Sequence, residues 1–168
     1  MTISIEESGM VFGPFAEDKV FRIETNPLFT HLGEGLKVSE FVLLRDVPDR
    51  PQAAWFIEAK SSAPQEHRIY VEEIRQKFTN SVQLTFAACL KRHPDTEEHL
   101  PGEFRNLDLE SCTVKCLLVI RNFRKEWIGP LQDALSKEMR SLVKTMGFSP
   151  TSITVINDEK ARELNLIT

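Results

Sequence analysis

Residues 54–60 read Ala-Trp-Phe-Ile-Glu-Ala-Lys, and this stretch decides the fold. Its aromatic and β-branched residues, placed after a turn-rich segment, favour a β-strand. Because successive side chains of a strand point to opposite faces, Glu58 and Lys60 share one face, while Trp55 and Ile57 occupy the other. The strand therefore presents an acid and an amine side by side.

A second β-rich segment, residues 38–44, precedes this strand, and the turn between them contains Pro48, Asp49 and Pro51. The two segments are expected to form an antiparallel hairpin, and a turn symmetric about Asp49 places Glu40 opposite Glu58. Facing like charges destabilise a strand pair by roughly 0.2 to 1 kcal/mol where they are exposed, and by more where solvent is excluded. Such a pair favours binding of a cation.

The chemistry of these groups suits a hard divalent ion. Mg²⁺ is typically bound by one or two carboxylates together with carbonyl oxygens, waters and substrate phosphates. Glu40, Glu58 and the carbonyl of Ala59 supply such ligands for Mg²⁺ or Mn²⁺, and Lys60 can hold a water or a phosphate oxygen beside the ion. Metal-assisted hydrolysis of a phosphodiester is the reaction expected of this set.

Residues 36–121, roughly, resemble the PD-(D/E)XK nuclease superfamily. The resemblance lies in an acid on one hairpin strand, a Glu-x-Lys element on the next strand, and then a helix and a further strand. The resemblance implies a divalent-metal-dependent nuclease, with DNA favoured over RNA as substrate, and catalytic roles for Glu40, Glu58 and Lys60. It also implies an acid from a preceding helix, for which Glu24 is the candidate, and a polar residue from the following helix, for which Gln76 is the candidate. This chain departs from the family pattern in having glutamate at the first acidic position and no proline before it.

Two aspartates are alternatives to Glu40 as the first acid. Asp46 and Asp49 lie nearer the turn, and a rise of about 3.3 Å per residue puts Asp46 roughly 20 Å from Glu40 along the strand. Glu40 is therefore preferred. Glu58 and Lys60 could also have a purely structural role. In that interpretation they are an exposed acid and base that protect an edge strand from aggregation.

The rest of the chain predicts a single α/β domain over residues 1–168, with a restriction-endonuclease-like three-layer core in which helices flank a central mixed sheet. A strand and a short helix are expected in the first 35 residues, and a long surface loop over residues 93–110. Three helices are expected further along the chain: one from a capping box at residues 62–65 to about residue 92, one from Pro130 to Gly147, and one that begins at about Asp158. Two more strands are expected, at residues 113–121, as the centre of the sheet, and at residues 153–156.

Composition limits the function classes. The hydrophobic content is 41% and the charged content 27%, without an apolar run long enough for a membrane span, so a cytoplasmic protein without membrane contact is expected. The formal net charge of −4 gives no general attraction to nucleic acid, so any such contact must be local. The basic stretch at residues 121–125 is either a phosphate contact or an ordinary charged loop. Cys89, Cys112 and Cys116 show no disulfide or zinc spacing.

A second function class therefore remains open. The acidic charge and small size also suit a catalytically inactive, nuclease-fold subunit that binds protein partners in a larger bacterial assembly, such as an antiviral defence complex. The oligomeric state does not follow from the sequence.

Overall fold

The computed structural model describes residues 1–168 and is built on a mixed five-stranded sheet with the strand order β3-β4-β5-β6-β7, beside a separate two-stranded hairpin, β1-β2. The strands are β1 (Thr2–Glu7), β2 (Met10–Ala16), β3 (Val20–Phe21), β4 (Phe41–Arg45), β5 (Ala53–Lys60), β6 (Thr113–Ile120) and β7 (Ile153–Asn157). The α-helices are α1 (Pro27–Thr30), α2 (Arg68–Cys89), α3 (Thr96–His99), α4 (Gly102–Arg105), α5 (Lys125–Glu138), α6 (Arg140–Met146) and α7 (Asp158–Glu163). Two short 3-10 turns, η1 (Glu17–Lys19) and η2 (Ile23–Thr25), flank β3.

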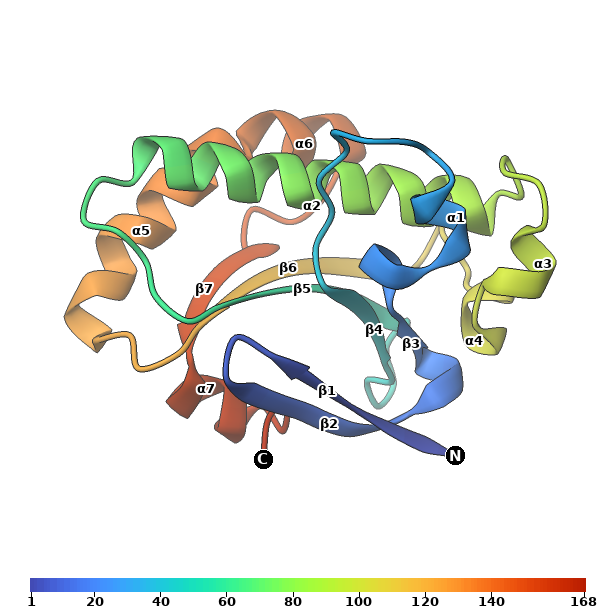
Figure 1. Ribbon diagram of the computed structural model, residues 1–168, viewed down its shortest axis with the longest axis horizontal. Helices are drawn as coiled ribbons and strands as arrows, with labels where there is room; N and C mark the ends of the chain where they lie inside the picture. The colour runs from blue at the N-terminus through green and yellow to red at the C-terminus, as the bar shows by residue number, and fades with distance from the viewer.

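The sheet lies between two different layers (Figure 1). Helices α2, α5 and α6 cover one face, whereas the β1-β2 hairpin and α7 cover the other. Each face has its own apolar cluster: 27 buried residues lie on the helix side and 16 on the hairpin side. The α/β class expected from the sequence is confirmed, but the second face is covered mainly by strands rather than by helices.

The hairpin formed by β4 and β5 has the predicted register. Phe41 pairs with Ile57 and Val42 with Phe56, as a turn centred on Asp49 requires. Asp49 itself adopts a left-handed conformation with φ of 58°, which aspartate tolerates in turns. Beyond this hairpin, β6 and β7 add in parallel, so the sheet is antiparallel on one side of β5 and parallel on the other. The predicted strand at residues 113–121 is thus an interior strand, next to β5 at the centre.

The N-terminal prediction was incomplete. Residues 2–16 form two strands joined at Ser8 and Gly9, both of which have positive φ, rather than one strand. Alternating apolar residues on both sides of a Ser-Gly pair are a hairpin signal. The expected short helix is present as α1, where the Asn26 side chain accepts from the Leu28 amide at the N-cap.

Two helix starts were predicted wrongly. Helix α2 begins at Arg68 instead of at the expected capping box, because residues 61–67 are used to carry the chain from the sheet to the helix layer (Figure 1). Helix α5 begins at Lys125, so that Pro130 lies inside it rather than at its first position. One helix was expected up to Gly147, but the chain forms two, α5 and α6, which meet at Met139. The expected stop at Gly147 is confirmed at the end of α6, with φ of 67°, as is the Asn157 cap of α7.

The segment from His93 to Glu110 is not the continuous surface loop that its polar composition suggested. It contains α3 and α4, and its apolar residues Leu100 and Phe104 are buried. The ring of Phe104 packs edge-on against Phe21, with the ring centroids 5.7 Å apart. Burial of these two side chains anchors the segment against β3. None of the helices has the length and apolar character that crossing a membrane requires.

Candidate functional site

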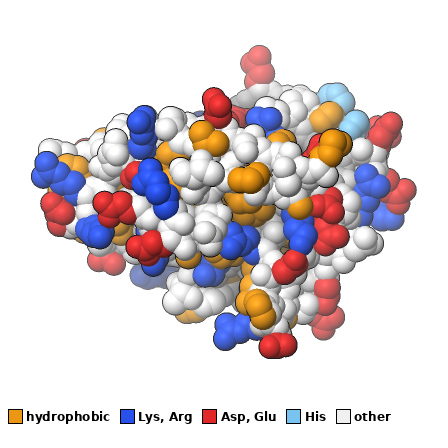
Figure 2. All heavy atoms as spheres, turned by 90° about the horizontal axis from the view of Figure 1, so that it is seen from below, with side chains coloured by type: hydrophobic (Ala, Val, Ile, Leu, Met, Phe, Trp, Pro, Cys, Tyr) orange, Lys and Arg blue, Asp and Glu red, His pale blue; other side chains and the backbone are white.

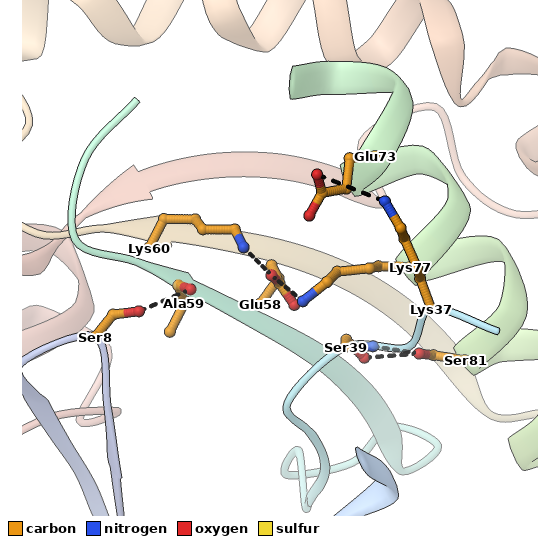
Figure 3. A network of polar contacts seen from close by, with 9 residues as sticks. All are labelled: Ser8, Lys37, Ser39, Glu58, Ala59, Lys60, Glu73, Lys77 and Ser81. Atoms are coloured by element: carbon orange, nitrogen blue, oxygen red, sulfur yellow. Dashed lines mark hydrogen bonds and ion pairs between the residues drawn. The ribbon is translucent and has the colours of Figure 1, made fainter. Parts of the chain in front are cut away.

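Glu58 is at the centre of a buried ion-pair network at the carboxyl end of β5 (Figure 3). Its side chain has no exposed surface, and one oxygen, Oε1, accepts from Lys60 Nζ at 2.9 Å and from Lys77 Nζ at 2.8 Å. Lys77 is 12% exposed and Lys60 26%. The predicted shared face of Glu58 and Lys60 is therefore confirmed, and the interpretation as an exposed edge pair is wrong, because Glu58 lies inside the protein.

The sheet and helix α2 together build this network. Ala54 and Phe56, which precede Glu58 on its face of β5, belong to the apolar cluster beneath the helices, so the strand aims Glu58 at α2. Lys77 extends from the same side of α2 as the buried residues Ile74 and Ser81, at the i, i+3 and i+7 spacing of one helix face. Lys77 was not predicted, and this spacing is the sequence signal that could have identified it.

Gln76, the residue predicted from α2, does not join the network. Its amide donates to Glu72 Oε1 at 3.1 Å on its own helix. Adjacent positions of a helix are rotated by about 100°, so Lys77 faces the sheet while Gln76 is turned aside. The structure thus places a cation from α2 beside Glu58, where the resemblance suggested a neutral polar side chain.

The charge states of the network follow from burial and pairing. The pKa of Glu58 is raised on balance, because burial outweighs the opposing charges and hydrogen bonds of Lys77 and Lys60. For Lys77, burial lowers the pKa, but the attraction of Glu58 outweighs it, and the net pKa is raised. Lys77 is therefore a permanent cation at neutral pH, and it stabilises the ionised form of Glu58.

Glu40 lies among three other acids, Glu58, Glu24 and Glu7. The pKa of Glu40 is raised to about 8, and burial is the largest cause. The charge of Glu58 and a hydrogen bond with Glu24 raise the pKa as well, and the charge of Glu7 adds a further repulsion. Glu40 precedes β4 in a bend, and its amide donates to the Ile57 carbonyl at 3.1 Å, so it stands just beyond the regular ladder. The charge of Glu58 thus acts on Glu40, and Glu24, predicted from the resemblance, lies beside Glu40. Glu7, at the end of β1, was missed.

The Ala59 carbonyl, predicted as a metal ligand, accepts a hydrogen bond from Ser8 Oγ at 3.0 Å (Figure 3). Ser8 lies in the β1-β2 turn, which was not foreseen as part of the site. The carbonyl oxygen keeps a second lone pair, so one hydrogen bond does not by itself prevent coordination. The tip of the β1-β2 hairpin therefore lies at the same end of the sheet as Glu58 and Lys60.

The remaining acids considered from the sequence lie elsewhere. Asp46, at the other end of the hairpin, pairs with Lys19 and accepts from Gln52 at 2.9 Å. Asp49 forms the turn itself. The preference for Glu40 over these two aspartates is consistent with where the structure places them.

The donor set fits a hard divalent cation in its chemistry. The second oxygen of Glu58, Oε2, is buried and has no hydrogen-bond partner, a costly state for a carboxylate oxygen. Four carboxyl groups, from Glu7, Glu24, Glu40 and Glu58, meet two ammonium groups here, so full ionisation leaves an excess of negative charge. No three acidic, histidine or cysteine side chains already surround a common point as ligands. Two carboxylates and a carbonyl, completed by waters and phosphate oxygens, are nonetheless a sufficient set for Mg²⁺.

The raised pKa of Glu40 predicts a specific pH dependence of stability. Between about pH 4.5 and 8 the unfolded chain carries an ionised Glu40, whereas the folded protein keeps the proton. The folded state then binds more protons, so this group makes stability fall as pH rises through that window, with no further change above it. Glu40→Gln removes the effect, and urea denaturation should show the variant more stable than wild type at pH 8.5 by about 2 kcal/mol after allowance for solvent screening.

The matched control is Glu73→Gln, a half-exposed acid on α2 that pairs with Lys37 at 3.7 Å. Its stability should stay within about 0.5 kcal/mol of wild type at both pH 5 and pH 8.5. Equal stabilities of Glu40→Gln and wild type at pH 8.5 would show that Glu40 is not held among repelling charges.

The fold defines an α/β protein with a mixed five-stranded sheet. Its candidate site is the buried ion-pair network of Glu58, Lys60 and Lys77 at the carboxyl end of the central strand, with further acids beside Glu40. In comparisons with known proteins, no family model, no curated protein and no solved structure matches the chain.

Proposed function

We propose that the chain is a divalent-metal-dependent nuclease of restriction-endonuclease-like architecture, which hydrolyses phosphodiester bonds, in DNA by preference. The observation that carries the proposal is Glu58, a fully buried carboxylate with one unpartnered oxygen, which is ion-paired to Lys60. The topology supports it as well: an antiparallel pair, a long helix and a parallel strand succeed one another in β4, β5, α2 and β6.

Each residue has a distinct role in this proposal. Glu58 and Glu40 would hold Mg²⁺ or Mn²⁺ with the second lone pair of the Ala59 carbonyl, and Glu24 would lie behind Glu40. When bound, such a cation supplies charge stabilisation to a phosphoryl group and lowers the pKa of a bound water. Lys60, the most exposed member of the ion-pair network, donates to the attacking water or to a phosphate oxygen. Lys77 keeps Glu58 ionised and oriented.

Nucleic acid would be held by local contacts. The formal charge is −4, and Figure 2 shows basic and acidic side chains interspersed over the face formed by the hairpin and α7. A surface of this kind offers no broad attraction to a duplex backbone. The substrate is therefore expected to contact a few residues close to Lys60.

The proposal is tested by adding the metal. At a Mg²⁺ or Mn²⁺ concentration ten times the dissociation constant, the melting temperature of wild type should rise by about 3–6 °C. Supercoiled plasmid should be nicked under the same conditions and left intact in EDTA. Glu40→Gln should lose both responses, whereas Glu73→Gln should keep both.

A second candidate function is favoured by one observation. Glu58 is already neutralised by two lysines, and Ser8 already occupies the Ala59 carbonyl, so the site holds together without a cation. This is the state expected of a catalytically inactive subunit that acts through protein partners, such as those of a bacterial defence complex. Absence of both metal responses, with stable association to a partner protein, would favour this second function.

A further inference from the structure

A cavity of about 480 Å³ lies between the segment that follows β5 and the start of α5. Both segments lie at the left-hand end of the molecule in Figure 1, where the chain leaves β5 and β6. The cavity begins three residues after Lys60, a distance of roughly 10 Å at most along extended chain. Its lining combines aromatic, proline and polar side chains: Ala63, Pro64, Gln65, His67, Phe123, Trp127 and Pro130.

Trp127 gives this cavity an exposed aromatic surface. Its side chain is 47% exposed, although it packs edge-on against the buried ring of Phe123 with the centroids 5.7 Å apart. Packing against Phe123 holds the indole of Trp127 in place, so the fold keeps part of this ring exposed to solvent. An ordered, half-exposed indole beside a cavity is a surface on which a flat ring can stack.

One guanidinium group without an acidic partner lies beside the cavity, and a second lies at the tip of the β1-β2 hairpin. The Arg124 guanidinium is 4.8 Å from the centroid of the Trp127 ring, and Arg121 packs against Gly9 in the β1-β2 turn. Neither forms an ion pair, whereas the neighbouring cations Lys125 and Arg162 are paired to Glu159 and Asp158. The Arg121 amide also donates to the Lys60 carbonyl at 2.9 Å, so Arg121 and Arg124 belong to the segment that leaves β6 beside the end of β5.

We propose that this cavity binds an unpaired nucleobase of a single-stranded segment, stacked against Trp127, while Arg124 contacts the adjoining phosphate. The inference rests on the proposed nuclease function and names its substrate as nucleic acid with at least one base outside a duplex. Bases stacked within a duplex cannot reach a side cavity unless they are flipped out. The polar groups of Gln65 and His67 are available to the edge of such a base, whereas an apolar protein anchor would leave Arg124 without complementary charge.

Binding is measured in EDTA, so that the result does not depend on metal or cleavage. The probe is a 12-nucleotide thymidine oligonucleotide with a fluorophore at one end, whose anisotropy measures binding by wild type and by every variant. Quenching of tryptophan fluorescence is followed in addition for wild type, because the other tryptophan, Trp55, is only 8% exposed. The oligonucleotide should quench the wild-type signal, and Trp127→Ala should bind it about tenfold more weakly, with Trp127→Phe in between. Arg124→Ala should weaken binding of the oligonucleotide. It should also reduce the slope of log binding constant against log salt concentration by about one, because one fewer phosphate is neutralised.

Three comparisons decide the outcome. A backbone of the same length with abasic sites should bind wild type about tenfold more weakly and quench little, as should the corresponding duplex. Equal affinity of wild type for the thymidine and abasic strands would overturn the proposal, as would unchanged binding by Trp127→Ala. Cleavage without base-dependent binding would reject this cavity while sparing the nuclease proposal, and base-dependent binding without cleavage would do the reverse.

Discussion

Plasmid nicking by Lys60→Ala is expected to fall by about 100- to 1000-fold, the usual effect of removing one group that stabilises developing charge. The fold should be retained, because Glu58 keeps its 2.8 Å contact with Lys77 when Lys60 is truncated. Cation binding should also persist, since both carboxylates remain, so the metal-dependent rise in melting temperature should be close to that of wild type. Loss of the rate with retention of metal binding is what separates a catalytic lysine from a structural one.

The control for this variant is Lys37→Ala. Lys37 is a half-exposed lysine that pairs with Glu73 on α2, on the same side of the molecule. Its removal takes away one positive charge without touching Glu58, so the nicking rate should stay within about twofold of wild type. A Lys60→Ala variant that nicks as fast as Lys37→Ala would remove Lys60 from the mechanism.

The second large effect concerns stability. Glu58→Met leaves the ammonium groups of Lys77 and Lys60 without their counter-charge, and breaking a buried pair in this way costs about 3–5 kcal/mol. Lys77→Met should cost less, about 1–3 kcal/mol, because Lys60 still neutralises Glu58. The double variant Glu58→Met/Lys77→Met should recover most of the loss, since apolar side chains of similar volume replace a buried ion pair with little penalty.

Urea denaturation of the four proteins forms a double-mutant cycle that isolates the coupling between Glu58 and Lys77. The corresponding cycle on Lys91 and Glu97, whose side chains are 64% and 74% exposed, should show no measurable coupling, because water screens an exposed pair. Additive losses at Glu58 and Lys77 would mean that the two side chains do not form the pair in solution.

Much of the site could be predicted because strand periodicity is strict. Alternation along residues 54–60 placed Glu58 and Lys60 on one face, and the turn at Asp49 fixed the register that brings Glu40 towards Glu58. These inferences use only local geometry and one tight turn. They required no knowledge of how the helices pack.

The missed residues depend on contacts between distant segments. Lys77 meets Glu58 only because α2 crosses this face of the sheet, and Ser8 meets Ala59 only because the N-terminal hairpin covers the other. The hairpin was overlooked at its Ser8-Gly9 turn, although the apolar alternation on both sides was present. Its position over β5 is set by burial of Ile5, Met10 and Phe12 in the second apolar cluster, which no local pattern reveals.

The errors at helix starts have a related cause. A proline or a capping pattern indicates where a helix can begin, but the length of chain needed to climb from the sheet to the helix layer determines where α2 does begin. Residues 61–67 serve that purpose, and in doing so they form one wall of the cavity beside Trp127. The irregular segment that was read as part of a helix thus lines the cavity proposed to bind a base.

The most direct measurement of the proposed centre is anomalous X-ray diffraction from a crystal soaked in Mn²⁺. We predict a peak about 2.0–2.6 Å from carboxylate oxygens of both Glu40 and Glu58, the contact distance of hard divalent ions, with Lys60 beside it. No peak at these two side chains, with Glu58 still bound by both lysines, would contradict the assignment of a metal-dependent nuclease.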